Sequence, residues 1–360
     1  MKRLSSLLAA GALSAAALVT PVTAGAATVT PEQVAGDAEL STISDLAPTP
    51  EVANQGWYGK YKDDPRVLKL QATSPAMNGR TIPLAVIPAK NANRPTIYLL
   101  NGAGSSEQNT DWLFNSDVVD FYADKDVNVV IPQAGAFSYY TDWQAEPHGK
   151  YLNGPQKWET FLTKELPGPL ESRLQANDKR AIAGMSMSAT SSLLLAQHNQ
   201  GFYDAAGSFA GCAATAYPLE YQFLRVTVNR GGAQPEQMWG EMGSATNRYN
   251  DALMNSEKLR GTKLYISSAS GLAGEKDTPS YYINQGYDPA LAYVGSAQLQ
   301  VEGGVIESAV NHCTHMLKAK LDKQGIPADY NFRNVGTHSW PGWEEDMQKS
   351  WATFESAFNS

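Results

Sequence analysis

The chain has 360 residues, 42% of them hydrophobic, and its 36 acidic residues outnumber 28 basic ones to give a net charge of −8. An acidic chain of this kind is a poor partner for nucleic acid, and charge would not hold it to an anionic lipid surface. Its length and hydrophobic content suit one large α/β domain or two smaller ones.

The N-terminus has the pattern of a secretory signal peptide. Two basic residues at positions 2–3 precede an apolar run over 7–19, and Ala24-Gly25-Ala26 follows. A basic start, a short apolar segment and an A-x-A site predict cleavage near Ala26, and the run is too short for a membrane span. We therefore expect residues 1–26 to be removed and the mature chain to be exported, with no transmembrane segment.

The remainder divides into a leader and a folded domain. A flexible leader is expected over 27–56, where Thr, Pro, Glu, Asp and Ala dominate without an apolar period. Strands are predicted over 67–72, 82–87, 96–100, 127–131, 181–183, 205–210, 264–268 and 330–335. Helices are predicted over 116–123, 158–166, 191–196, 305–323 and 340–358. This alternation predicts a single α/β domain over 57–360, with a mostly parallel sheet covered on both faces. The irregular segment 218–261 is expected to form a loop-and-helix insertion over the site.

The stretch Gly184-Met185-Ser186-Met187-Ser188 lies between a predicted strand and a predicted helix. A strand, a sharp turn carrying a serine and a helix describe the nucleophile elbow of the α/β-hydrolase fold. Ser188 replaces the glycine that usually ends this motif, although it is still small. Alone the match is weak, because serines between small residues also occur in ordinary tight turns. It predicts Ser186 as a nucleophile if a histidine, an acid and oxyanion donors accompany it.

Histidine is the side chain best suited to take the proton of a serine. Of the histidines that follow the elbow helix, His338 falls between the last predicted strand and the closing helix, at the carboxyl edge of the sheet. We expect it to be the base. His312, Cys313 and His315 could suggest a metal site, but two histidines four residues apart and a fourth ligand are missing. No metal or other cofactor is expected.

An oxyanion hole needs two backbone N–H groups. The first is expected from Met187, and the second from the glycine-rich loop after the strand over 96–100. That loop lacks the Lys-Ser/Thr ending of a phosphate loop. The identity of the acid that orients the histidine remains open at this point. Glu275 and Asp277 follow the strand over 264–268, which is the usual place for this acid, and Glu307 is the alternative.

Cys212 and Cys313 are the only cysteines. In an exported protein an isolated pair favours a disulfide over a metal site, and two buried free thiols are the alternative.

Five segments in chain order carry a family resemblance, and they span 96–102, 137–143, 157–166, 184–188 and 336–340. Together they resemble the secreted mycolyltransferases, which comprise the mycobacterial antigen 85 proteins and their corynebacterial relatives, from about residue 57 to 358. The resemblance implies transfer of a mycolyl or corynomycolyl chain through a seryl acyl-enzyme. The donor would be trehalose monomycolate, the acceptor trehalose or cell-wall arabinan, and the location the cell envelope with its lipids.

Carried over by position, the resemblance also implies roles for individual residues. It implies Ser186 as nucleophile, His338 as base, Glu307 as acid in preference to Glu275, Ala103 as the second oxyanion amide, and Asn101, Asn115 and Trp340 as trehalose contacts. The family often has Asp at the position of Asn101 and Arg at that of Gly104, so the acceptor stays open. The cysteine pair also differs from the mycobacterial arrangement, and a bridge would brace the helix of Glu307.

Two other functions remain open from the sequence. A secreted carboxylesterase would form the same acyl-enzyme and pass the acyl group to water, so only a product assay with labelled trehalose separates it. A non-catalytic adhesin or wall-binding module on a hydrolase fold is disfavoured by the intact serine, histidine and oxyanion loop. Failure of a serine-directed phosphonate to label Ser186 would favour that module.

Overall fold

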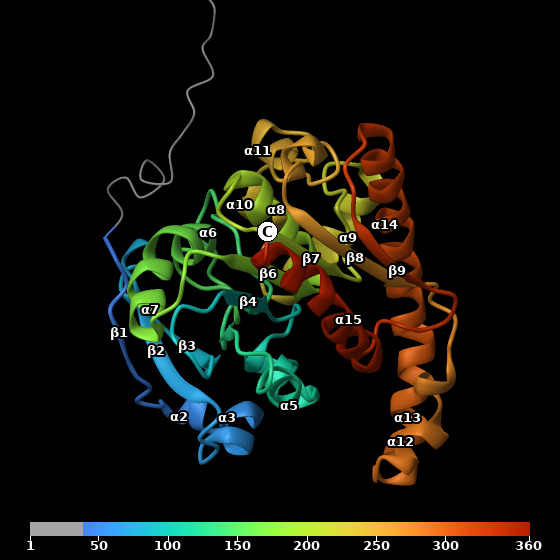
Figure 1. The fold of residues 1–360 in the computed structure, drawn as a ribbon. Coiled ribbons are helices and arrows are strands. Elements are labelled where there is room, and N and C mark those ends of the chain that lie inside the picture. Colours follow the sequence, from blue (N-terminus) through green and yellow to red (C-terminus); the bar gives the residue numbers. More distant parts are fainter. Residues whose placement is uncertain (1–38) are drawn as a thin grey trace, which may run out of the picture.

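A nine-stranded sheet forms the centre of the protein in the computed structural model, which describes residues 39–360 (Figure 1). The predicted signal peptide over 1–26 and the start of the leader lie outside the described residues. The strands are β1 Ile43–Asp45, β2 Leu68–Ser74, β3 Arg80–Ile87, β4 Thr96–Leu100, β5 Asn128–Pro132, β6 Arg180–Met185, β7 Ala205–Phe209, β8 Lys263–Ala269 and β9 Asp329–Arg333.

The sheet is mostly parallel, as predicted. Its order is β1-β2-β3-β5-β4-β6-β7-β8-β9. Neighbouring strands in the part β5-β4-β6-β7-β8-β9 pair in parallel, whereas those in the part β1-β2-β3-β5 pair antiparallel. After β4 the chain adds β5 on one side of that strand and β6 on the other. This switch of direction opens a crevice outside the carboxyl ends of β4 and β6, where α/β sheets bind ligands. Leu100 pairs with Gly184 in the register of these strands, so the loops that follow them start side by side.

Helices cover both faces of the sheet. They are α2 Pro50–Ala53, α3 Gly56–Tyr61, α4 Trp112–Asn115, α5 Val118–Tyr122, α6 Trp158–Thr160, α7 Pro167–Leu174, α8 Met187–His198, α9 Pro218–Arg230, α10 Pro235–Trp239, α11 Ala245–Tyr249, α12 Pro279–Asn284, α13 Pro289–Gln298, α14 Gly304–Gln324 and α15 Trp340–Phe358. Short 3₁₀ or π turns are η1 Pro75–Met77, η2 Ser106–Gln108, η3 Phe161–Glu165, η4 Ser256–Leu259, η5 Glu275–Asp277 and η6 Leu299–Gly303. None of the helices within 39–360 is both long and apolar enough to cross a bilayer.

The two faces of the sheet bury separate apolar clusters because side chains alternate along each strand. Tyr98 of β4 faces the cluster that contains the leucines of α8 and α14. Its neighbour Ile97 faces the cluster that contains Trp112 of α4 and Phe354 of α15. The side chains of β4 and β5 are buried throughout, which is typical of strands covered on both sides.

The prediction of a flexible leader over 27–56 is wrong for residues 39–56, the part that the structure describes. Residues 43–45 form β1, which pairs antiparallel with β2, and α2 and the first residue of α3 follow before residue 57. The strand is short and its side chains are half-buried or exposed, so it has no apolar alternation that a sequence reading could detect. Backbone hydrogen bonds to β2 hold it instead, as expected for an edge strand.

The expected insertion over the site is also corrected. Residues 218–261 do form short helices and loops, but they pack beside α8. The Asp251 carboxylate accepts hydrogen bonds from the backbone of Thr215 and Ala216, and Gln197 of α8 donates to the Ala252 carbonyl. Among residues 218–261 only Arg230 lines the cavity next to Ser186, whereas Tyr281 and Tyr282 of α12 both line it.

Candidate active site

Ser186 occupies a strained turn between β6 and α8. Its φ is +56° and its ψ is −119°, a region that non-glycine residues rarely adopt. A Cβ at Gly184 would lie 2.6 Å from the carbonyl carbon of Ser188, so the strand and the helix leave no room for a side chain there. The Ser188 hydroxyl accepts a hydrogen bond from Met185 N at 3.0 Å and lies 3.1 Å from the Leu100 carbonyl. The serine that replaces the usual glycine therefore ties the turn to the end of β4.

Three distant elements bring Ser186, His338 and Glu307 into one hydrogen-bonded chain. His338, in the loop between β9 and α15, places Nε2 2.7 Å from Ser186 Oγ. Its Nδ1 lies 2.7 Å from Oε2 of Glu307, in the first turn of α14, while Glu307 Oε1 accepts from Ala269 N at 2.6 Å. The Glu307 side chain is fully buried. A carboxylate that accepts from Nδ1–H leaves Nε2 free to accept the serine proton.

The rival acids hold other positions. Asp277 is buried, and its carboxylate accepts from the Thr337 hydroxyl at 2.7 Å and the Ser339 hydroxyl at 3.2 Å, on both sides of His338. Among residues 39–360 the hydrogen bonds and ion pairs of the His338 ring go to Glu307 and Ser186 and not to Asp277, and Glu275 is exposed. Asp277 thus fixes the loop that carries His338, and Glu307 contacts the ring.

Two backbone amides beside Ser186 are oriented by their own peptide planes. The Gly102 carbonyl accepts from Ser105 N at 3.2 Å, and the Ser186 carbonyl accepts from Ala189 N at 3.1 Å. Because a trans peptide is planar, the N–H groups of Ala103 and Met187 point the opposite way from these carbonyls. Neither amide donates to a protein acceptor among residues 39–360, so both are available to an anion.

His338 stands between two adjoining cavities that differ in character. The first, of about 670 Å³, is lined by Ser186, the Gly102–Gly104 loop, aromatic side chains and polar groups that include Asn115, Asp117 and Glu344. The second, of about 530 Å³, is lined mainly by α13, η6 and Ile306, and most of these groups are apolar. The two cavities share Tyr282, Tyr287, Leu299 and His338. Burial raises the pKa of Tyr282 to about 12, so its phenol is neutral at physiological pH.

Two of the three expected sugar contacts line a cavity, and the third does not. Asn115 and Trp340 line the first cavity, where the Trp340 ring stands edge-on to Trp343. The expected contact by Asn101 is wrong, because this side chain is fully buried. Its amide donates to the Pro132 carbonyl at 2.9 Å and accepts from Trp112 N at 3.1 Å. Both polar ends of Asn101 are therefore used to hold the loop, a role that the sequence analysis missed.

Gly104 marks another difference from the family pattern. A Cβ at this position would meet the hydroxyl of Thr110 and would lie 2.7 Å from Oε1 of Gln108, two side chains that line the first cavity. An arginine could be placed here only if both were displaced. The cavity wall at this point is thus made by Gln108 and Thr110 in place of a side chain at 104.

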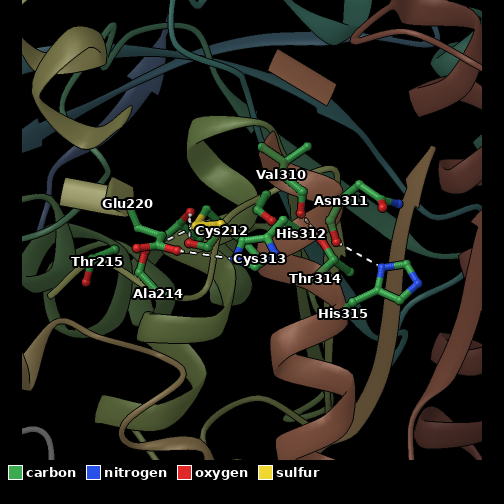
Figure 2. The surroundings of a disulfide bond; sticks show 12 residues. Cys212, Ala214, Thr215, Glu220, Val310, Asn311, His312, Cys313, Thr314 and His315 are labelled. Carbon is green, nitrogen blue, oxygen red and sulfur yellow. Dashed lines mark hydrogen bonds and ion pairs between the residues drawn. A yellow bond between two sulfur atoms is a disulfide. The ribbon is translucent and has the colours of Figure 1, made fainter. Parts of the chain in front are cut away.

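The structure confirms the predicted disulfide between Cys212 and Cys313, whose Cα atoms are 4.9 Å apart (Figure 2). It joins the loop after β7 to α14, six residues beyond Glu307, and Thr314 Oγ1 donates to the nearby Gly211 carbonyl at 3.2 Å. His312 and His315, next to Cys313 on α14, point away from each other (Figure 2). His312 Nε2 lies 3.6 Å from Glu220 Oε1, and His315 Nδ1 lies 2.9 Å from the Asn311 carbonyl.

Comparisons with known proteins place the chain in a family. A protein-family model described as a putative esterase matches residues 74–354. The diacylglycerol acyltransferase/mycolyltransferase Ag85A of Mycobacterium gordonae is 29% identical over 286 residues, which cover 78% of this chain and 77% of the relative. Ag85B of Mycobacterium leprae, with the same description, is 28% identical over 281 residues, which cover 76% of this chain and 79% of the relative.

Solved structures show the same fold. MPT51 of Mycobacterium tuberculosis has a TM-score of 0.65 at 20% identity, covering 81% of this chain and 98% of its own. An S-formylglutathione hydrolase of Agrobacterium tumefaciens has a TM-score of 0.58 at 15% identity, covering 81% and 96%. The architecture is therefore that of the esterase-type α/β-hydrolases.

Proposed function

This chain belongs to the esterase family, as a relative of the antigen 85 proteins, and we propose that it is an acyltransferase acting on mycolyl esters. In this proposal it moves a mycolyl or corynomycolyl chain from trehalose monomycolate to trehalose or to cell-wall arabinogalactan. The observation that carries the proposal is the contact of Ser186, His338 and Glu307 at the meeting point of a polar and an apolar cavity.

The first half of the proposed cycle forms an acyl-enzyme. His338 Nε2 takes the proton of Ser186, and Oγ attacks the carbonyl carbon of the mycolyl ester. The negative oxygen is held by the amides of Ala103 and Met187; one such donor contributes about 10²–10³-fold in rate in other serine enzymes. Glu307 stabilises the imidazolium that forms. The bond to the sugar oxygen then breaks, and trehalose leaves with the proton from Nε2.

The second half runs the same steps in reverse with a new alcohol. An acceptor hydroxyl gives its proton to His338 Nε2 and attacks the carbonyl of the acyl-enzyme. The Ser186 oxygen leaves and recovers a proton from the imidazolium. Transfer competes with hydrolysis, so the acceptor has to displace water from the first cavity.

The two cavities suit the two parts of a glycolipid. The first combines the indole of Trp340 with amide and carboxylate groups, including Asn115 and Asp117, a set that can pack on a sugar ring and hydrogen-bond its hydroxyls. The second offers an apolar wall beside the same histidine, where an acyl chain would lie. With the sugar in the first cavity and the chain in the second, the ester carbonyl falls between them, next to Ser186.

We further propose that the protein works outside the cytoplasm, at the cell envelope. The support is the signal-peptide pattern over 1–26 and the cysteine pair, which forms a disulfide as oxidising compartments permit. Envelope lipid would then be both the source of the donor and one partner of the enzyme.

The test is to incubate the purified mature chain with trehalose monomycolate and radiolabelled trehalose, and to identify the labelled products. The proposal predicts labelled trehalose mycolates, and it predicts none with the Ser186→Ala variant. Release of free mycolic acid without labelled lipid would show a carboxylesterase. If a serine-directed phosphonate also failed to label Ser186, the non-catalytic module would be favoured.

A further inference from the structure

An exposed apolar surface extends from the second cavity along α13, η6 and the start of α14. Eight of the sixteen large hydrophobic side chains that are exposed within residues 39–360 lie between 272 and 306. Four of them, Leu291, Val294, Val301 and Val305, are 68–69% exposed and follow one another at helical spacings of three, seven and four residues. These four residues form the apolar stripe. Figure 1 shows α12 and α13 at the edge of the molecule, away from the central sheet.

The surroundings of the apolar stripe argue against another protein helix as its partner. Helices that pair through such a stripe carry charged residues on both flanks, which set the partner and the register. Between residues 289 and 306 the chain has a single charged residue, Glu302, and three glycines. The stripe therefore lacks the means to specify a protein partner, and what it offers is non-directional apolar contact.

The apolar stripe is continuous with the catalytic cavity. Leu291 belongs to the stripe and also lines the second cavity, together with Ile306 and His338. An apolar route thus leads from the protein surface to within contact of the catalytic imidazole. A long acyl chain that entered along the stripe would not have to cross water before its ester reached Ser186.

The charge of the segment selects the type of lipid. Residues 278–317 contain no lysine or arginine, whereas Asp288 and Glu302 are exposed there. Attraction to anionic headgroups depends on basic residues near the surface. A surface with apolar side chains and no cations suits a layer whose headgroups are uncharged, such as sugars, or zwitterionic.

We propose that the apolar stripe docks the enzyme on a lipid layer with uncharged or zwitterionic headgroups, so that the acyl substrate passes from the layer through the second cavity. The inference rests on the proposed function in one respect, that the substrate is a lipid ester. Docking itself does not require chemistry. It can therefore be tested on a chain that cannot turn over.

The experiment measures flotation of the mature Ser186→Ala chain with phosphatidylcholine vesicles, and with vesicles that also contain phosphatidylglycerol. We expect binding to phosphatidylcholine, no gain from the anionic lipid, and no loss between about 0.1 M and about 1 M NaCl, because screening does not affect apolar contact. The triple change Val294→Ser, Val301→Ser and Val305→Ser should lower the partition coefficient at least about tenfold. Val226→Ser changes a valine of α9 that is 63% exposed and lies outside the apolar stripe; it is the control and should change nothing.

A second measurement excludes misfolding as the cause. When the triple change is made in the chain that keeps Ser186, this variant should hydrolyse a soluble butyrate ester at the parent rate, since none of the three valines lines either cavity. Equal flotation of the parent and the triple variant, or binding that salt abolishes, would overturn the proposal. So would a parent dimer in sedimentation that the triple variant dissociates, because the occupant would then be a second copy. If docking holds but no mycolyl transfer occurs, the proposed function fails and the lipid-docking surface stands.

Discussion

The two sides of His338 are built in opposite ways. On the elbow side, Ser186 and its neighbours are held by buried hydrogen bonds: Ser188 ties the turn to β4, and Asn101 ties the start of the Gly102–Gly104 loop to β5 and α4. On the other side, the segment 279–306 carries exposed valines and leucine along one edge and has few polar contacts with the body of the protein. One side fixes reacting atoms in place, and the other leaves apolar surface uncovered.

The difference matches what the two halves of the proposed lipid-transfer reaction would require. Bond making at Ser186 depends on positions held to a fraction of an ångström, which only a buried and fully bonded frame supplies. Collecting an acyl chain from a lipid layer depends instead on apolar area that is open to the outside. His338 belongs to both sides of the site, because its ring contacts Glu307 and the residue lines both cavities.

The largest effect on activity is expected from Glu307→Gln on the elbow side. An amide can still contact Nδ1, but it does not stabilise the imidazolium and can impose the wrong tautomer, so kcat/KM for a soluble ester should fall about 10³–10⁴-fold. Steady-state kinetics measure this. Glu275→Gln, which alters the exposed carboxylate of the η5 turn, is the matched control and should keep full activity. Equal losses in both variants would contradict the assignment of the acid.

A smaller effect is expected from Asp277→Asn. The amide would set N–H groups against the donors of Gly274 and Thr337, so the loop of His338 would shift without loss of the imidazole's own partner. Such a misplacement should lower kcat about 10–100-fold. A loss as large as that of Glu307→Gln would mean that both carboxylates act on the imidazole alike.

Removing the disulfide should act on stability more than on chemistry. The double change Cys212→Ser and Cys313→Ser opens a bridge between residues 101 apart, and the free energy of unfolding should fall by about 2–5 kcal/mol. Urea unfolding measures it. Because α14 also packs on β8, the folded fraction should keep most of its activity. An unchanged unfolding midpoint would show that the bridge does not brace α14.

The smallest effect on stability and activity is expected from Val301→Ser in the segment 279–306. The side chain is 69% exposed, so the free energy of unfolding should change by no more than about 0.5 kcal/mol. Turnover of a soluble ester should also stay the same. A clear loss of stability would show that the valine is covered in solution, and the contrast between the two sides would weaken.

The sheet and the contact between Ser186 and His338 could be predicted because both depend on local signals. Buried parallel strands appear as continuous apolar runs, and β4 has the bounds that its sequence predicts. Ser186 stands in a short motif, and His338 lies in the loop after the last strand, which any α/β sheet brings to the same edge.

Other features depend on packing that no local pattern records. Glu307 and Asp277 both come after β8, and their roles differ only in what they contact: Glu307 contacts the ring of His338, and Asp277 contacts the residues on either side of it. Asn101 was expected to contact the sugar because the family resemblance places a trehalose contact at this position, whereas its side-chain amide is hydrogen-bonded to backbone groups of Pro132 and Trp112. The helix over 289–303 was missed because its apolar residues face outward, so it lacks the polar face that marks a surface helix.

The central claim is that Ser186 carries the acyl group on its way to a sugar. The most direct test mixes the enzyme with a trehalose monoester, quenches the reaction rapidly, and measures the mass of the chain and of its peptides. The account predicts one added acyl group on the peptide that contains Ser186, none in Ser186→Ala, and faster loss of the adduct when free trehalose is added. An adduct on another residue, or a rate of loss that trehalose does not change, would contradict it.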